Sequence, residues 1–129
     1  MATVSVRYFV TELDPAIAFY RDLLGFAVDL VPAPTFAMLH RGDLRLLLSV
    51  PGGGPGGGAA MPDGTLPAPG GWNRFALEVP DLEDTVAFLR GEGARFRNEI
   101  VTGVGVKQIV VEDPSGNPVE LHQPLGNRP

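Results

Sequence analysis

The chain has 129 residues, which fits one compact domain with a substantial hydrophobic core. Its net charge of −5 argues against a broad basic surface for nucleic acid or for an anionic membrane. No cysteine is present, which excludes disulfides and thiolate chemistry, and no apolar run approaches the roughly 20 residues of a membrane span.

The first elements in chain order are a strand and a helix. Residues 4–10 are rich in β-branched and aromatic side chains, as strands are. Asp14 followed by Pro15 predicts the start of a helix, with the aspartate as N-cap, and Gly25 predicts its end. The apolar residues that share one face of this helix are Ile17, Tyr20, Leu23 and Leu24.

Three further strands are predicted in the first half, at residues 26–31, 36–41 and 44–50. Gly42 and Asp43 form a tight turn between the last two. The first half therefore reads βαβββ.

The second half repeats this order. A strand is predicted at 73–79, and Asp81 with Asp84 resembles a capping box at the start of a helix. Gly91 and Gly93 end that helix. Its buried stripe is Leu82, Val86 and Leu89. Strands follow at 94–98, 107–112 and 118–123, the last two joined by a turn at 114–117.

Five residues recur between the halves at a constant offset of 69 positions. They are Val10, Leu13, Ala18, Phe19 and Arg21, repeated as Val79, Leu82, Ala87, Phe88 and Arg90. We therefore predict an α+β fold of two βαβββ modules in tandem, forming a cupped mixed sheet with a central cleft. Module one is 1–50 and module two is 72–129, within one domain spanning 1–129.

The segment 51–71 between the modules contains nine glycines and five prolines. This composition is typical of a mobile linker. A flap over the cleft is the functional alternative. A phosphate-binding loop is disfavoured, because no Gly-Lys-Ser/Thr string and no following helix are present.

Two stretches resemble the vicinal oxygen chelate superfamily, which includes glyoxalase I, extradiol dioxygenases, fosfomycin-resistance enzymes and bleomycin-resistance proteins. They are IAFYRDLLGF at 17–26 in the first helix and EDPSGNPVEL at 112–121 in the last hairpin. The stretch FAMLHRGDLRL at 36–46 is similar to the central hairpin of the bleomycin-resistance group. The resemblance covers nearly the whole chain outside the linker.

The resemblance implies four metal-ligand positions, on the first and last strands of each module. They fall at Ser5, Leu46, Arg74 and Glu120. A leucine is no ligand, a neutral serine is a poor one, and a guanidinium repels a cation. We therefore expect no metal and no cofactor.

The chain has two histidines, His40 and His122. Strand alternation puts His122 on the same face as Glu120, so a facial triad of both histidines with Glu120 is one reading. The other reading is a solvent-exposed His40 beside a turn and a hydrogen-bonded His122.

Alternation also predicts which side chains face the cleft. The predicted ligand-binding set is Ser5, Arg7, Phe9, Leu46, Leu48, Trp72, Arg74, Glu120 and His122. Trp72 or Phe9 could stack on a planar ligand, and Arg7 or Arg74 could pair with an acidic group. Arg74 and Glu120 could instead form an ion pair with each other.

Three functions stay open at this point. The first is a metal-free protein that binds a small molecule, sequestering an antibiotic or aromatic metabolite as the bleomycin-resistance type does. The others are a metal-dependent lyase, isomerase, dioxygenase or thiol transferase of the superfamily, and a metal-free enzyme with Glu120 as catalytic general base. We expect a homodimer, as the resemblance implies. We also expect a cytoplasmic location, since no secretory signal is visible.

Overall fold

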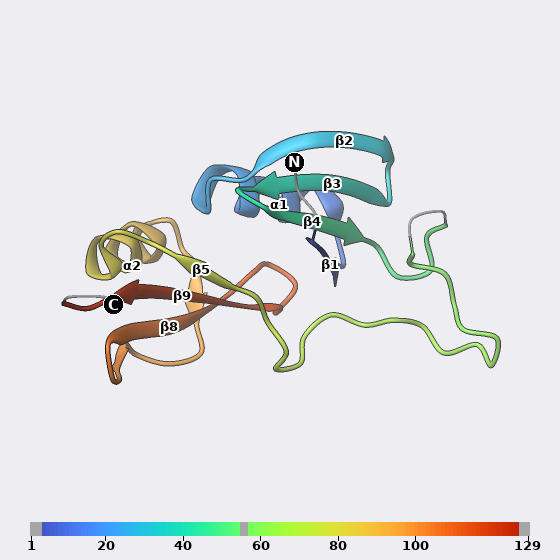
Figure 1. Ribbon diagram of the computed structural model, residues 1–129. Helices are drawn as coiled ribbons and strands as arrows, with labels where there is room; N and C mark the ends of the chain where they lie inside the picture. Colours follow the sequence, from blue (N-terminus) through green and yellow to red (C-terminus); the bar gives the residue numbers. More distant parts are fainter. Residues whose placement is uncertain (1–3, 55–56, 127–129) are drawn as a thin grey trace. The chain divides into compact units, whose positions relative to one another are not determined.

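The computed structural model describes residues 4–54 and 57–126 (Figure 1). These residues divide into two compact units. Unit 1 comprises those up to Gly70 together with Pro114–Asn117, and unit 2 comprises Gly71–Asp113 and the residues from Pro118 onward. Among the helices in the described ranges, none combines the length and hydrophobicity that a bilayer crossing requires.

Unit 1 is built on a four-stranded sheet in the order β1-β4-β3-β2. The strands are β1 (Val4–Phe9), β2 (Ala27–Ala33), β3 (Phe36–Arg41) and β4 (Leu44–Ser49). β1 runs parallel to β4, and the other pairs are antiparallel. Gly42, at φ +58°, allows the two-residue turn between β3 and β4 that the sequence predicts.

The helix of unit 1 begins earlier than its sequence suggests. α1 (Leu13–Ala18) continues as a π-helical turn, η1 (Phe19–Leu23). The prediction of Asp14 as N-cap is wrong: the cap position is Glu12, which makes no side-chain capping bond. Pro15 is still accommodated, because the first helical turn needs no backbone N–H from it. The helix ends at Leu23, and Gly25 follows the cap residue Leu24 at φ +75°, in agreement with the prediction that this glycine ends the helix.

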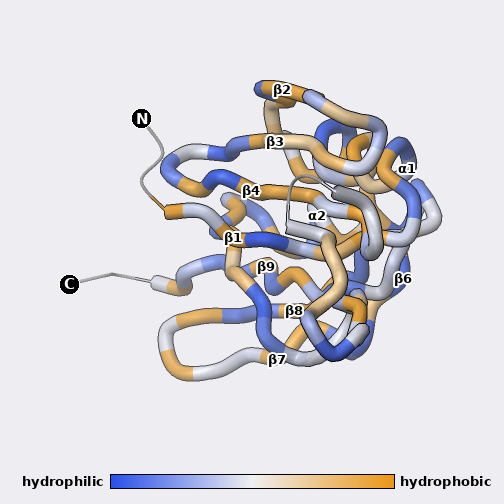
Figure 2. The backbone as a smooth tube through the Cα atoms, turned by 90° about the vertical axis from the view of Figure 1, so that its right-hand side faces the viewer, coloured by the Kyte–Doolittle hydropathy of each residue, from blue (hydrophilic) through white to orange (hydrophobic). Residues whose placement is uncertain are grey.

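The core of unit 1 lies on the face of its sheet that α1 covers, since α1 contacts β3 and β4. The buried side chains on this face come from the helix and from alternate strand positions. They are Tyr8, Ile17, Tyr20, Ala37, Leu39, Leu46 and Leu48. Figure 2 shows the run of hydrophobic residues along β4.

Unit 2 has a sheet in the order β5-β9-β8-β6, with β7 also paired to β8. Its strands are β5 (Ala76–Glu78), β6 (Arg95–Phe96), β7 (Val101–Thr102), β8 (Val106–Glu112) and β9 (Pro118–Pro124). β5 runs parallel to β9, as β1 does to β4. The short β7 was not predicted from the sequence.

The helix of unit 2, α2 (Leu82–Gly91), starts where its sequence predicts. The Asp81 carboxylate accepts a hydrogen bond from the Asp84 backbone N–H at 3.0 Å. The expected stripe of Leu82, Val86 and Leu89 is buried. In the first turn, a hydrogen bond from the Lys107 ammonium lowers the pKa of the Glu83 carboxyl. The α+β fold is thus confirmed, and unit 2 repeats the βαβββ order of unit 1 with β7 as an additional short strand.

The glycine-rich segment after β4 makes specific contacts within unit 1. The Gly52 N–H donates to the Gly58 carbonyl at 2.7 Å, and the Gly70 N–H donates to Asn117 Oδ1 at 2.7 Å. The segment therefore begins with a hydrogen-bonded turn and ends at a residue that is bonded to Asn117. Its mobility stays a prediction.

Candidate functional site

The open face of the unit 2 sheet carries the carboxylate that the sequence singled out. Along β9, Val119 and Leu121 are buried, whereas Glu120 and His122 are partly exposed. Glu120 lies in register between Ala76 of β5 and Val110 of β8. Glu120 and His122 therefore share one face, as strand alternation predicts.

Arg74 and Glu120 form an ion pair. Arg74 donates to Glu120 Oε1 from Nη2 at 3.0 Å and from Nε at 3.1 Å. Their side chains are 28% and 20% exposed, so the pair is shielded on most sides. The alternative in which these two residues pair with each other is thus confirmed.

The second oxygen of the Glu120 carboxylate remains available. Both hydrogen bonds from Arg74 end on Oε1, and no other described residue donates to this side chain. Oε2 is not among buried polar atoms lacking a partner, so it must be accessible. Glu120 therefore offers an acceptor whose charge Arg74 balances.

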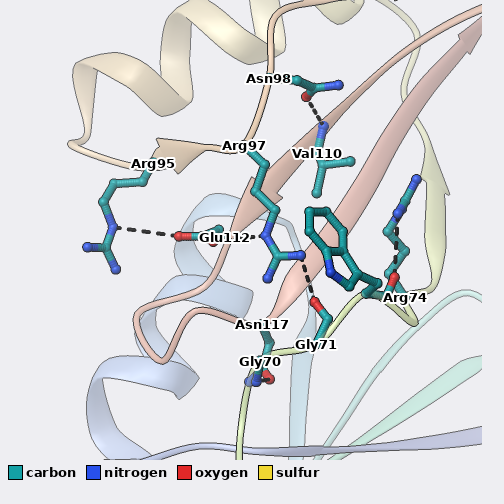
Figure 3. Close-up of polar contacts among 10 residues, drawn as sticks. Gly70, Gly71, Arg74, Arg95, Arg97, Asn98, Val110, Glu112 and Asn117 are labelled. Atoms are coloured by element: carbon teal, nitrogen blue, oxygen red, sulfur yellow. Dashed lines mark hydrogen bonds and ion pairs between the residues drawn. The ribbon is translucent and has the colours of Figure 1, made fainter.

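Trp72 presents an indole ring that is supported from one side. The Arg97 guanidinium lies 4.6 Å from the ring centroid, in cation–π geometry. Figure 3 shows Arg97 held between the Glu112 carboxylate, at 2.9 Å, and the Gly71 carbonyl, at 2.6 Å. The Arg97 side chain is only 16% exposed, whereas Trp72 is 72% exposed. The ring is thus backed by a fixed cation and open to solvent.

Sequence reasoning missed Arg97 and Glu112 as parts of this site. Arg97 follows the two-residue strand β6, and its backbone N–H bonds to the Val110 carbonyl. Neither the spacing of Arg97 from Trp72 nor any sequence motif predicts the contact between these two residues. Trp72 and Arg97 both lie outside the strands, so strand alternation does not predict that they meet.

The open face of unit 1 carries Ser5, Arg7 and Phe9, as predicted. The register of β1 pairs them with Arg45, Leu47 and Ser49 of β4. Leu46 and Leu48 were expected on this face, and that expectation is wrong. Both are fully buried on the opposite face, in register with Val6 and Tyr8. Because side chains alternate, a shift of one residue reverses the face.

Arg7 makes a hydrogen bond and a ring contact on this open face. Its Nη1 donates to Ser49 Oγ at 2.9 Å, and its guanidinium lies 5.8 Å from the centroid of the Phe36 ring. Phe9 and Leu47 lie beside it at half-buried positions. A cation on a largely apolar surface is the result.

The two histidines have separate surroundings. His40 Nδ1 lies 2.7 Å from Asp29 Oδ1, and its side chain is 44% exposed, as its position beside a turn suggested. His122 lies in register with Glu78 and Gln108. In the part of the chain that the structure describes, no group of three or more histidine, aspartate or glutamate side chains could hold a metal ion.

The residues at the four implied ligand positions do not fit a metal. Arg7 and Ala76 are equivalent positions in the two repeats. Ala76 pairs with Glu120 and Arg7 pairs with Leu47, so the counterpart of Glu120 is Leu47, not Leu46. It is again a leucine. In unit 2, the single carboxylate is bonded by the Arg74 guanidinium. This donor chemistry does not suit a divalent cation.

Comparisons with known proteins agree with this fold. The family model "Glyoxalase/Bleomycin resistance protein/Dioxygenase superfamily" matches residues 3–121. A comparison with curated protein sequences gives no match.

Many solved structures share the fold. A lactoylglutathione lyase from Agrobacterium tumefaciens has a TM-score of 0.74 at 21% identity, covering 95% of this chain and 92% of that one. A superfamily member from Sphaerobacter thermophilus has a TM-score of 0.74 at 24% identity, covering 95% and 98%. A virulence protein from Salmonella typhimurium has a TM-score of 0.72 at 20% identity, covering 97% and 98%. With the family match over most of its length, the chain belongs to the glyoxalase/bleomycin resistance protein/dioxygenase superfamily.

Proposed function

We propose that this protein binds a planar organic molecule without a metal, and that it sequesters an antibiotic or an aromatic metabolite. The observation that carries the proposal is the exposed Trp72 ring, backed by Arg97. The proposed ligand-binding residues of unit 2 are Trp72, Arg74, Glu120 and His122. Ser5, Arg7 and Phe9 stay proposed ligand-binding residues of unit 1, considered by itself.

The contact of Arg97 with the Trp72 ring favours ligand binding, because the ring is already ordered before a ligand binds. Arg97 is fixed by Glu112 and Gly71 and stacks on one face of the ring. A flat aromatic ligand could stack on the exposed surface and bury apolar area there. A ring already held in place loses little conformational freedom on binding.

Glu120 supplies a means of orienting the ligand. Arg74 occupies Oε1 and leaves Oε2 open to an N–H or O–H donor. Such a contact fixes orientation, while the aromatic surface supplies most of the contact area.

The same open oxygen favours a second candidate, a metal-free enzyme with Glu120 as general base. In that case Glu120→Gln would abolish turnover and retain ligand affinity.

The first test combines metal analysis with ligand binding. We expect purified protein to contain no stoichiometric transition metal and to keep its thermal stability in a chelator. A screen of planar natural products should raise the melting temperature with at least one compound, since a ligand specific to the folded state stabilises it. Trp72 is the single tryptophan, so its fluorescence reports binding directly.

The matched variants are Trp72→Ala and Phe88→Ala. Phe88 is an aromatic residue of α2 that is 50% exposed. Loss of one stacking partner should weaken binding by about tenfold or more. Phe88→Ala should retain wild-type affinity. Unchanged affinity in Trp72→Ala, or stoichiometric metal lost in Glu120→Gln, would overturn the proposal.

We also propose that the protein acts as a homodimer in the cytoplasm. The support for both is the family membership and the sequence features given above. Light scattering coupled to gel filtration would measure the mass in solution.

A further inference from the structure

The outer strand of the unit 1 sheet exposes apolar side chains beside the helix. β2 ends the strand order β1-β4-β3-β2, so its outer edge pairs with no other strand of the described residues (Figure 1). Val28 lies in register with the buried Leu39 and therefore lies on the side of the sheet that α1 covers. Val28 and Val31 are nevertheless 37% and 48% exposed. An exposed edge strand with apolar side chains is a surface on which another chain can associate.

A groove of about 590 Å³ lies between this strand and the helix of unit 1. It has an apolar lining with one acidic and one basic side chain. The lining residues are Asp14, Ile17, Arg21, Ala27, Val28 and Val31. None of them belongs to the ligand-binding residues proposed above, so the groove is a second surface of unit 1.

The two charged side chains of the groove lie on the helix, seven residues or roughly two turns apart, with Ile17 between them. The Asp14 carboxylate makes no hydrogen bond or ion pair within the part of the chain that the structure describes. Arg21 donates from Nε and Nη2 to Asp22, and its side chain is 51% exposed. Its remaining N–H groups can therefore meet a second carboxylate.

We propose that a second copy of this chain binds to the surface formed by α1, η1 and β2, with Asp14 of each copy facing Arg21 of the other. This inference rests on the proposed homodimer and deepens it, because it names the interface. In a twofold-symmetric contact, residue i of one copy meets residue j of the other, and j meets i. An axis beside Ile17 pairs position 14 with position 21 twice and brings the two apolar grooves together.

Side chains make this contact, because the edge of β2 is unsuited to a continuous backbone ladder with another strand. The register with β3 shifts between Val28 and Leu30 and again between Leu30 and Ala33. Pro32 also has no backbone N–H to donate. Such irregularities work against edge-to-edge pairing. The apolar residues therefore supply the contact area, and the paired charges fix the orientation of the two copies.

The first experiment reverses the two charges one at a time. Asp14→Lys makes both charged positions positive, and Arg21→Glu makes both negative. Each variant alone should raise the dissociation constant of the dimer at least about tenfold, since like charges then face each other twice. An equimolar mixture of the two variants should associate again, because opposite charges meet at both contacts. Sedimentation equilibrium measures the constants, and native mass spectrometry identifies the mixed dimer by its mass.

The control variants carry matched substitutions at exposed positions of unit 2. Glu92→Lys and Arg95→Glu change the net charge by the same amounts as the two test variants. Both should dimerise as wild-type protein does. Val31→Asp places a charge in the groove and should also weaken the dimer at least about tenfold, whereas Val104→Asp, at a fully exposed valine, should not. Circular dichroism confirms that each variant is folded.

Recovery in the mixture cannot come from a general loss of stability, since both components carry a damaging substitution. A dimer that survives both charge reversals would refute this interface and leave the proposed homodimer standing, and wild-type protein that stays monomeric would refute both. A mixture that does not associate would refute the pairing of Asp14 with Arg21. Monomeric wild-type protein that binds anilinonaphthalene sulfonate, with binding lost in Val31→Asp, would show instead that the groove takes a small molecule. The Trp72 variants judge the proposed ligand binding separately.

Discussion

Arg97 and Arg74 hold one short stretch of backbone in unit 2. Arg97 donates to the Gly71 carbonyl, and Arg74 makes a long 3.4 Å hydrogen bond to the Trp72 carbonyl. Each guanidinium also bonds to a carboxylate on the sheet, Glu112 or Glu120. Two charge-assisted contacts thus fix the backbone that carries the exposed indole.

Replacing Arg97 with methionine should therefore release Trp72. The variant leaves the Glu112 carboxylate, only 25% exposed, without its closest partner, and we expect a loss of about 1–2 kcal/mol in unfolding free energy. Acrylamide quenching and emission of Trp72 should both change, because the cation leaves the ring. Chemical denaturation and fluorescence measure the two effects.

Arg95→Met is the matched control. Arg95 approaches the same carboxylate at 4.0 Å, and its side chain is 69% exposed. An exposed ion pair of this kind contributes little, so stability and tryptophan emission should both stay near wild type. Equal effects of the two substitutions would contradict the role given to Arg97.

The two helices differ at their first residues, although their sequences are repeated. α2 has a side-chain cap from Asp81, and α1 has none from Glu12. Asp81→Ala should lower the unfolding free energy by about 1 kcal/mol, because the Asp84 N–H loses its acceptor. Glu12→Ala should leave stability nearly unchanged. Urea denaturation measures both, and a larger effect of Glu12→Ala would contradict this account.

The order of helices and strands along the chain followed from the sequence, apart from the short β7, whereas the face of β4 did not. Aligning the two hairpins on the turn glycines Gly42 and Gly116 gives Leu46 as the counterpart of Glu120. Gly42 lies in a two-residue turn, whereas Gly116 lies in a five-residue turn between Glu112 and Pro118. The unequal loops shift the alignment by one residue, which exchanges Leu47 for Leu46 and reverses the face. Apolar residues on both faces of β4 gave no alternation to correct it.

The candidate site, like the fold, could be predicted from the sequence only in part. The Arg74–Glu120 pair could be foreseen because Glu120 lies on β9 and Arg74 lies two residues before the neighbouring strand β5, at positions that the repeat indicates. The contacts of Arg97 with Trp72, and of Gly57 with Arg7, could not. Gly57, Trp72 and Arg97 all lie outside the strands, and no periodicity governs the contacts of such residues.

At the scale of the whole molecule, the units are not continuous in sequence. Pro114–Asn117, which connect β8 to β9, belong to unit 1. Asn117, only 3% exposed, donates to the Phe9 carbonyl at 2.7 Å and accepts from the Gly70 N–H. One side chain thus satisfies two backbone groups of unit 1.

Asn117→Ala should therefore destabilise the protein by about 1–3 kcal/mol, since both backbone groups lose their partner. The exposed Asn73 provides the control, and Asn73→Ala should change stability by less than about 0.5 kcal/mol. Thermal and urea unfolding measure the difference. Equal stabilities of the two variants would show that water replaces the lost contacts.

The position of Asn117 has a consequence for biosynthesis. The strands of unit 1 are translated first, but Asn117 follows Phe9 by 108 residues. Domains usually fold in the order in which they emerge from the ribosome. Unit 1 cannot complete these contacts until Asn117, which is encoded in the second half of the chain, has been synthesised. A polypeptide cut between the repeats would therefore lack Asn117 in its first half, and the Phe9 carbonyl and the Gly70 N–H would lose the side chain that pairs with both.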